Sequence, residues 1–299
     1  MPNKIKKFLA YNKKVSVICA DTTILVEQTR KIHDLTPTTT ATIGRVITAA
    51  TMMAHQQIKE LTDNITIQIK GNGPIGSIVA IASLEDEKTA NIKTYLENPH
   101  TELPLKSNGK IDVGGAVGRQ GYLNIIKQNN VTSANYNGLI PLVSGEIAED
   151  FAEYFAKSEQ KPTAIALGVL VNKDGVKRAG GYIINPMPDA SDEDISKIEE
   201  ALKNAKTISE MLDMDLTLEE IAKIVTGDEN IETLEDNLDV EYKCNCSKER
   251  IETGIMSLGK EEINKIIEED GKLDAKCHFC HKNYHFDIEE LNKLKEGAK

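Results

Sequence analysis

The chain has 299 residues, of which 40% are hydrophobic, and a formal net charge of −11. This length allows a full hydrophobic core and about two domains. No apolar run approaches the roughly 20 residues that a membrane-crossing helix needs, and the acidic balance argues against a protein that neutralises nucleic-acid phosphates with Lys and Arg.

Residues 1–190 alternate strand-like and helix-like patterns, which predicts an α+β core domain with an antiparallel-rich sheet. The N-terminal stretch is basic, but its apolar run breaks at Asn12 after four residues. This run is too short for a signal peptide, so we expect a cytoplasmic protein. Apolar–polar patterns predict strands at 14–20, 23–28, 64–70, 77–83, 164–172 and 180–188, with hairpin turns at 71–76 and 173–175.

Two segments of this core domain carry helical periodicity. Residues 38–54 are expected to form a helix with an apolar face made of Ile43, Val46, Ile47, Ala50 and Ala54. Residues 144–160 predict an amphipathic helix with Ser144 as its N-cap. Its apolar stripe is expected to consist of Ile147, Phe151, Tyr154 and Phe155.

Residues 191–243 form an acidic segment with 5 basic and 17 acidic side chains, a net charge of −12, against +3 for residues 1–190. A solvated helical face is the simplest interpretation of such a run. The segment predicts short helices at 191–205 and 217–225, the second opened by the capping-box pair Thr217 and Glu220.

Short helices are marginal in isolation, so we expect this helical acidic linker to depend on docking and to open early. Apolar positions of this segment that need a surface to pack on are Ile195, Ile198 and Leu202.

Residues 244–299 form a small C-terminal domain that carries four of the five cysteines, Cys244, Cys246, Cys277 and Cys280. Four thiolates from two short knuckles are typical of a tetrahedral zinc site, so we expect one Zn²⁺ per chain. About 56 residues is near the lower limit for a self-supporting core, and a metal would supply the missing stability. Basic residues near the knuckles are expected to offset the net charge of the tetrathiolate: Lys243, Lys248, Arg250, Lys276 and Lys282.

The spacing of these cysteines leaves two interpretations open. The site is either an inert structural zinc ribbon or a redox switch. A disulfide within the Cys-x-Cys knuckle would be strained, and strained disulfides tend to be labile and regulatory. Structural zinc contributes roughly 10–16 kcal/mol in small domains, so metal loss would unfold this domain rather than loosen it.

The other motifs offer no catalytic constellation, and we expect a protein that is not an enzyme. Cys19 lies in an apolar run and is expected to be a core residue. The glycine pattern at 71–76 lacks the helix of a dinucleotide site, and the Walker-like stretch 254–260 lacks the preceding strand and the final Ser or Thr. Three histidines near the knuckles could substitute as ligands, but with four cysteines available they are expected to lie at the surface or beside the ligands: His278, His281 and His285.

The sequence resembles the heat-shock protein 33 family, the redox-regulated holdase chaperones, along nearly its whole length. The stretch EYKCNCSKERIETGIMSLGKEEINKIIEEDGKLDAKCHFCHKNYHFD at 241–287 is similar to the family's zinc-binding domain. Supporting stretches are GNGPIGSIVAIA (71–82), LIPLVSGEIAEDFAEYFAKSEQ (139–160) and GGYIINPMP (180–188).

This resemblance favours the switch. It implies that the four cysteines hold zinc in an inactive reduced form and that oxidants convert them to the disulfides Cys244–Cys246 and Cys277–Cys280. Zinc would then be released, the C-terminal domain and linker would lose order, and the oxidised homodimer would bind unfolding client proteins without ATP. The candidates for the client-binding surface are then the core face that the linker covers and the apolar residues of the linker itself: Ile195, Ile198, Leu202, Met211 and Leu212.

Two rivals from other classes stay open to simple assays. A zinc-ribbon regulator would bind nucleic acid in a salt-dependent way, and a thiol–disulfide oxidoreductase would reduce insulin catalytically.

Overall fold

The computed structural model describes residues 4–58, 60–61, 63–129, 134–234 and 238–298. The chain divides into two compact units, Met1–Tyr242 and Lys243–Lys299. The first unit contains both the predicted core domain and nearly all of the predicted acidic linker. The second unit contains the four clustered cysteines.

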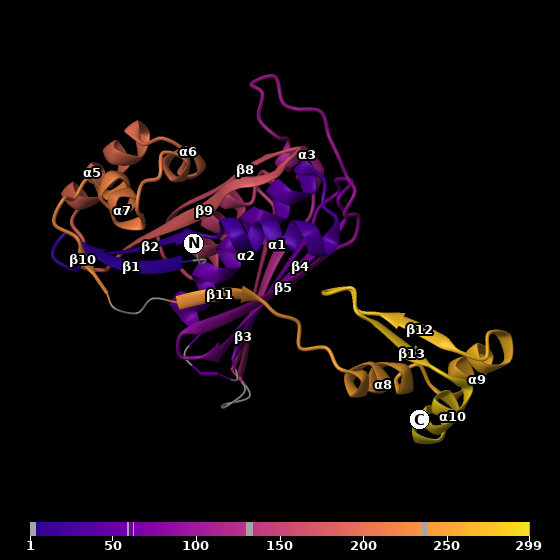
Figure 1. Cartoon of the computed structure of the whole chain (residues 1–299). Helices are drawn as coiled ribbons and strands as arrows, with labels where there is room; N and C mark the ends of the chain where they lie inside the picture. The colour runs from indigo at the N-terminus through magenta and orange to yellow at the C-terminus, as the bar shows by residue number, and fades with distance from the viewer. Residues whose placement is uncertain (1–3, 59, 62, 130–133, 235–237, 299) are drawn as a thin grey trace. The chain divides into compact units, whose positions relative to one another are not determined.

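The strands that the structure describes in the first unit belong to one mixed sheet (Figure 1). They are β1 (Lys4–Ala10), β2 (Val15–Asp21), β3 (Asn64–Lys70), β4 (Ser77–Asp86), β5 (Thr89–Leu96), β6 (Tyr122–Asn129), β7 (Ala134–Pro141), β8 (Ala164–Asn172), β9 (Gly175–Pro186), β10 (Glu232–Thr233) and β11 (Leu238–Tyr242). Among the described residues the strand order is β7-β6-β3-β4-β5-β11-β1-β2-β9-β8. The short strand β10 lies off this path and pairs with β1. The pairs are antiparallel except β11 with β5, which confirms the predicted antiparallel-rich α+β fold.

Both predicted hairpins are present. Lys70 pairs with Ser77 across the glycine-rich turn of β3 and β4, and Asn172 pairs with Gly175 between β8 and β9. The glycines at 71–76 therefore close a strand pair and do not open a helix. Gly71 and Gly73 also lie against the backbone of Val117, where a Cβ atom would come within 3 Å of backbone atoms.

Among the described residues, four helices accompany this sheet in the core part of the first unit. They are α1 (Thr23–His33), α2 (Pro37–Gln57), α3 (Val113–Val117) and α4 (Ala148–Lys157). The predicted helix at 38–54 is confirmed as α2, whose side chains from Thr38 to Ala54 are buried apart from Arg45. Among the described residues, no helix combines the length and apolar character needed to cross a membrane.

The strand predicted at 23–28 is wrong, because these residues open α1. The side chain of Asp21 accepts hydrogen bonds from the backbone and hydroxyl of Thr23, which turns the chain out of β2. Leu25, Val26 and Thr29 are buried at helical spacing. The six-residue window, rich in β-branched and apolar residues, was too short to reveal that period.

The N-cap predicted at Ser144 is also wrong. The helix α4 begins at Ala148, and the buried carboxylate of Asp150 accepts from the backbone N–H groups of four preceding residues: Val143, Ser144, Gly145 and Ile147. The predicted apolar stripe is confirmed, since Ile147, Phe151, Tyr154 and Phe155 are all buried. The carboxylate of Asp150, inside the helix, thus caps the backbone N–H groups that the Ser144 hydroxyl was expected to cap.

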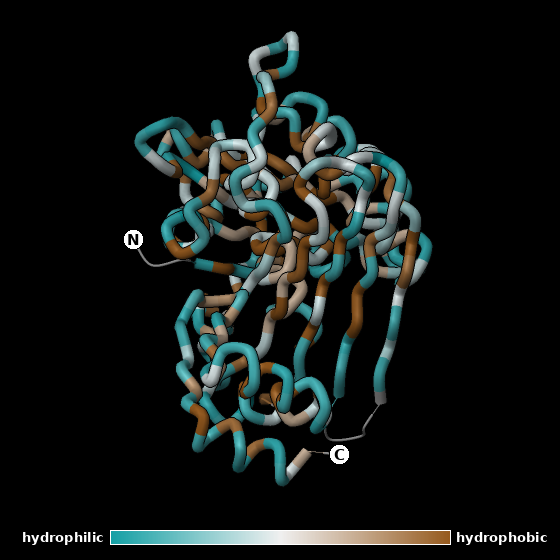
Figure 2. The backbone as a smooth tube through the Cα atoms, turned by 90° about the vertical axis from the view of Figure 1, so that its right-hand side faces the viewer, coloured by the Kyte–Doolittle hydropathy of each residue, from teal (hydrophilic) through white to brown (hydrophobic). Residues whose placement is uncertain are grey.

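The two faces of the sheet bury different clusters. On β2, Ile18 and Ala20 belong to the main core, which includes α2, whereas Val17 and Cys19 face the other way. This alternation follows from the period of two in a strand. Figure 2 shows hydrophobic segments gathered inside the larger unit, with hydrophilic residues along its outer loops.

Three short helices of the acidic segment pack on that second face: α5 (Asp192–Asn204), α6 (Ile208–Asp213) and α7 (Leu218–Thr226). Each begins with a complete capping box, including the predicted Thr217–Glu220 pair of α7. The cluster they close, called here the linker cluster, includes Phe8, Val15, Val17, Cys19, Tyr182, Ile198, Met211, Leu212, Ile221 and Val225. The expected docking is therefore confirmed for Ile198, which is buried, and for Leu202, which packs against the cluster while partly buried; Met211 and Leu212 are buried in the same cluster.

The second unit contains helices α8 (Lys248–Met256), α9 (Lys260–Glu269) and α10 (Ile288–Gly297), and a hairpin of β12 (Leu273–Lys276) and β13 (Asn283–Phe286). Its small core comprises Ile255, Ile263, Cys277, Tyr284, Phe286, Leu291 and Ala298. Cys277 is thus both part of this core and part of the cysteine cluster.

Candidate metal centre

The second unit brings the four predicted cysteines together. The sulfurs of Cys244, Cys246, Cys277 and Cys280 all lie within 4.8 Å of one another. Two of the distances between sulfurs are 3.4 Å, from Cys246 to Cys280, and 3.7 Å, from Cys244 to Cys277. All four are free thiols.

These distances fit a tetrahedral tetrathiolate zinc site. A Zn–S bond of about 2.3 Å places two sulfurs of a regular tetrahedron about 3.8 Å apart. Among the described residues, this group consists of cysteines alone, and sulfur donors in tetrahedral number favour zinc or an iron–sulfur centre over hard cations.

Local backbone structure positions both knuckles. Cys277–Cys280 lies in the turn of the β12–β13 hairpin, where the Cys277 N–H donates to the Lys282 carbonyl and the His281 N–H donates to the Cys277 carbonyl. His281 takes a positive φ of 60°, which lets the chain reverse. Cys244 and Cys246 immediately precede α8, which starts behind the N-cap Ser247.

The surroundings of the sulfurs shift the pKa values of the cysteines in different directions. Burial raises the pKa of Cys244 to about 12 and also raises the pKa of Cys280. Burial acts in the same direction on Cys246, but hydrogen bonds from the Tyr284 hydroxyl and the neighbouring cysteines outweigh it and lower that pKa to about 7. A lowered pKa favours the thiolate form, which is the form that binds a metal.

Two of the basic residues expected near the knuckles, Lys248 and Arg250, contact other groups of the second unit. Lys248 forms an ion pair with Glu290 and lies 5.0 Å from the centre of the Phe286 ring. Arg250 donates a hydrogen bond to the carbonyl of Asn245, the residue between Cys244 and Cys246 in the sequence.

The exposed His285 pairs with Asp274 across the hairpin at 2.8 Å. Cys19 is fully buried in the linker cluster, as predicted for a core residue.

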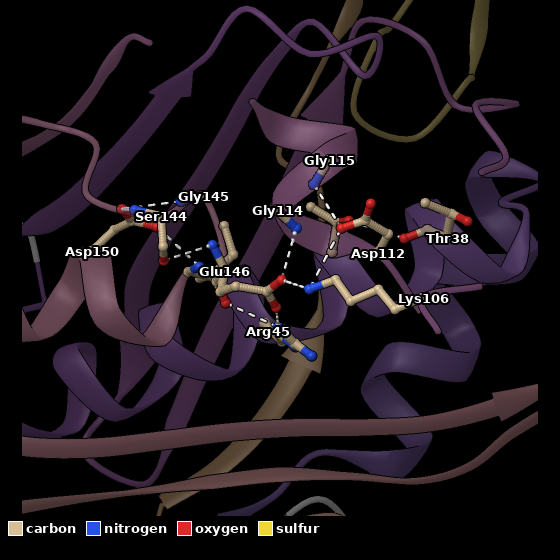
Figure 3. A network of polar contacts seen from close by, with 12 residues as sticks. Thr38, Arg45, Lys106, Asp112, Gly114, Gly115, Ser144, Gly145, Glu146 and Asp150 are labelled. Atoms are coloured by element: carbon tan, nitrogen blue, oxygen red, sulfur yellow. Dashed lines mark hydrogen bonds and ion pairs between the residues drawn. The ribbon is translucent and has the colours of Figure 1, made fainter. Parts of the chain in front are cut away.

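Sequence reasoning missed a second polar cluster, which lies in the first unit (Figure 3). Glu146 accepts from Arg45 of α2 at 2.8 Å and from the Gly114 N–H of α3 at 3.1 Å, and it also pairs with Lys106. Asp112 lies 3.4 Å from the same Lys106. Arg45 and Glu146 are 101 residues apart in the sequence, so no local motif could predict this cluster.

This cluster predicts an acid-sensitive contribution to stability. Burial raises the pKa of Glu146, but hydrogen bonds from Lys106 and Arg45 outweigh it and hold that pKa below its ordinary value. The stabilisation is therefore present above the ordinary carboxyl pKa and is lost as pH falls through the lowered pKa of the folded state. Glu146→Gln should lower the free energy of unfolding at pH 7 by about 1–3 kcal/mol, since hydrogen bonds to a charged group are lost.

Urea unfolding at pH 7 and pH 3 measures this effect, and the difference between variant and native chain should shrink at pH 3. The exposed Glu87, in the β4–β5 turn, is the matched control: Glu87→Gln should change stability by less than about 0.5 kcal/mol. A Glu146→Gln effect that is equal at both pH values would contradict the ionic account.

Comparison with known proteins agrees with this geometry. A family model described as Hsp33 protein matches residues 3–287. A 33 kDa chaperonin of Thermoanaerobacter sp. (strain X514) is 43% identical over 297 residues, with 99% of this chain and 98% of that protein covered. A 33 kDa chaperonin of Geobacillus kaustophilus (strain HTA426) is 40% identical over 300 residues, with 100% and 99% covered. The crystal structure of a 33 kDa chaperonin from Thermotoga maritima superposes with a TM-score of 0.88 at 33% identity and covers 99% of both chains.

The fold and site define a protein with a large antiparallel-rich sheet unit followed by a small unit built around four thiols. The chain belongs to the Hsp33 family.

Proposed function

We propose that this protein is a redox-regulated, ATP-independent holdase chaperone whose reduced, zinc-bound form is inactive. The observation that carries the proposal is the tetrathiol cluster, because one of its cysteines is also part of the small core of the second unit. The names of the relatives support a chaperone role. We further propose the functional division into a core domain (1–190), an acidic linker (191–243) and a switch domain (244–299).

In the reduced state, Cys244, Cys246, Cys277 and Cys280 would bind one Zn²⁺. When bound, the metal supplies cross-links between the two knuckles that 57 residues of chain otherwise lack. The small core of the second unit then keeps Tyr284 and Phe286 buried. The thiolates stay reduced in the cytoplasm, which is where we place the protein.

Oxidation would remove these ligands. For each pair of cysteines, two thiolates, one peroxide molecule and two protons yield one disulfide and two water molecules, so the sulfurs are oxidised and the peroxide is reduced. Family resemblance assigns the pairs Cys244–Cys246 and Cys277–Cys280, and all four sulfurs are close enough for either pairing to start. A disulfide cannot serve as a thiolate ligand, so metal binding would be lost and the second unit would unfold.

The client surface would come from the linker cluster. The helices α5, α6 and α7 have 13, 6 and 9 residues, which is marginal for helices outside a tertiary structure. Their order depends on the apolar face of β1, β2 and β9 that they cover. Once they detach, both that face and their own apolar stripe would bind unfolding clients, and we propose that two oxidised chains associate as a homodimer through part of this surface.

The test uses reduced, zinc-loaded protein treated with peroxide at heat-shock temperature. Zinc release is followed with a chromogenic chelator while the aggregation of a heat-denatured client is measured in parallel. We expect about one zinc per chain to leave as suppression of aggregation appears. If zinc stays bound, or leaves without any gain in client protection, the second unit is an inert ribbon and the proposal fails.

A further inference from the structure

The strand β11 occupies an interior place in the main sheet. It lies between β5 and β1 as the orange arrow in Figure 1, and it joins the strands from β7 to β5 to the strands from β1 to β8. Its parallel pairing with β5 covers 239–242, whereas its antiparallel pairing with β1 covers only Leu238 and Asp239. Five residues late in the chain therefore complete a sheet whose two halves are built from residues 4–186.

The side chains of β11 alternate between the core and solvent. Leu238, Val240 and Tyr242 are at most 8% exposed and belong to the main core, whereas Asp239 and Glu241 are exposed. The space between β5 and β1 thus accepts an extended segment with an apolar side chain at every second position and polar side chains between them.

Tyr242 anchors the end of β11 that leads into the second unit. Its hydroxyl lies 2.8 Å from Nε2 of the buried His33 and donates a hydrogen bond to the Thr94 carbonyl of β5 at 3.2 Å. Cys244 follows two residues later and belongs to the sulfur cluster. The strand is therefore joined through a single residue to the unit whose unfolding the proposed function requires.

The chain path makes β11 the covalent route from the second unit to the acidic helices. The helices α5, α6 and α7 follow β9, and after α7 the chain returns to the sheet as β10 and β11. The acidic helices are thus tethered to the sheet at both ends. Unfolding that starts at the cysteines and spreads along the chain has to remove β11 from the sheet before it reaches α7.

Removal of β11 would open a slot with a strand edge on each side. Both β5 and β1 would present backbone N–H and C=O groups toward the gap, and the main core would be uncovered where the three apolar side chains of β11 had packed. A single exposed strand edge already pairs with extended chains. The slot would offer two such edges together with an apolar floor.

We propose that the slot between β5 and β1 is a second client-binding site, filled by β11 in the reduced protein and by an extended client segment after oxidation. This inference rests on the proposed function. The linker cluster offers apolar side chains, whereas the slot binds the client backbone by strand pairing and selects alternating apolar and polar residues. Unfolding proteins expose such segments, because half-buried strands have this alternation.

The probe for the slot is a fluorescein-labelled peptide with the sequence ETLEDNLDVEY of residues 232–242. Its binding to full-length, reduced, zinc-loaded protein is compared with its binding to the same protein after peroxide treatment. Fluorescence anisotropy should show at least about tenfold tighter binding to the oxidised protein, because β11 competes for the slot in the reduced form.

Backbone methylation of the probe separates strand pairing from simple apolar contact. Consecutive N–H groups of a strand point toward opposite neighbours, so N-methylation at the positions of Val240 and Glu241 removes one donor toward each strand. The methylated peptide keeps every side chain and should bind the oxidised protein about tenfold more weakly.

Hydrogen exchange resolved along the sequence locates the site. In oxidised protein, the amides of 89–92 and 4–5 should exchange faster than in reduced protein, and saturating probe should restore most of their protection. The pairing of Asn64–Lys70 with β6 is the internal control, because two strands separate β3 from the slot. Its protection should be the same in all three samples.

Val240→Asp should open the slot without oxidant, because it places a carboxylate at a core position that is 3% exposed. Reduced, zinc-loaded Val240→Asp should bind the probe at least about tenfold more tightly than the reduced native chain. The control Glu241→Gln changes an exposed side chain of the same strand and should leave the weak binding of the reduced chain unchanged. The peptide experiments on the native chain do not depend on the folding of this variant.

Protection of 89–92 that persists in oxidised, zinc-free protein would show that β11 stays in the sheet, and it would overturn the site. Equal binding of the native and N-methylated peptides would also overturn it, because contact without strand pairing needs no slot. Either result leaves the proposed function intact, provided that the oxidised protein still suppresses client aggregation. A native chain that kept zinc under peroxide, or gained no chaperone activity, would overturn both proposals.

Discussion

Cys277→Ser should abolish stable zinc binding and unfold the second unit while leaving the first unit folded. Cys277 is 7% exposed and belongs both to the sulfur cluster and to the small core formed by Ile255, Ile263, Phe286 and Leu291. A structural zinc site of this kind contributes roughly 10–16 kcal/mol, comparable to the whole stability of a domain. Metal content per chain, together with hydrogen exchange resolved along the sequence, measures the effect.

We expect zinc to fall from about one per chain to near zero and amide protection to vanish across 243–299. Chaperone activity should then no longer require oxidant. The control is Cys19→Ala, which removes the one cysteine outside the cluster and should leave zinc content unchanged. A Cys277→Ser chain that lacked zinc yet kept a folded second unit and native oxidant dependence would refute the switch.

Ile221→Ala should release the acidic helices in the reduced protein. Ile221 is 0% exposed in the linker cluster, at the centre of the face that α7 presents to β1 and β2. Truncating a buried isoleucine costs about 2–5 kcal/mol, and short helices have little other stabilisation to offset that loss. We expect faster amide exchange in α5–α7 and measurable suppression of client aggregation without peroxide, while zinc stays bound.

Ile224 provides the matched comparison, since it lies on the same helix but is 40% exposed. Ile224→Ala should change stability by less than about 0.5 kcal/mol and leave the reduced protein inactive. If Ile221→Ala loosened α5–α7 without any activity in the reduced state, the client surface would have to lie elsewhere than on the linker cluster.

The two wrong sequence predictions share a physical cause. At Thr23–His33, β-branched and apolar residues favour a strand over six residues, and only the longer burial pattern and the turn made by Asp21 select a helix. At α4, the cap comes from Asp150 inside the helix, because its buried carboxylate can reach four backbone N–H groups at once. Local propensity is a weak prior: the burial pattern of the whole helix decided the first case, and a short-range carboxylate cap decided the second.

The end of the acidic segment shows a related limit. Residues beyond Thr226 continue as β10 and β11, and β11 inserts between β5 and β1 in the main sheet. The sequence pattern there was too short to predict a strand, because its place depends on partners about 150 and 235 residues earlier in the chain. Joining the sheet also explains why the first compact unit extends to Tyr242.

By itself, the sequence determined the α+β character of the core, the amphipathic stripe of α4, the capping box at Thr217 and the four-cysteine constellation. These features are short-range, because helix and strand periods, helix caps and the spacing within each knuckle depend on residues only a few positions apart. The tertiary structure alone decided the strand order, the ion pairs around Glu146 and the hydroxyl of Tyr284 on Cys246. Each of these depends on residues far apart in sequence, and only the folded chain brings them within contact distance.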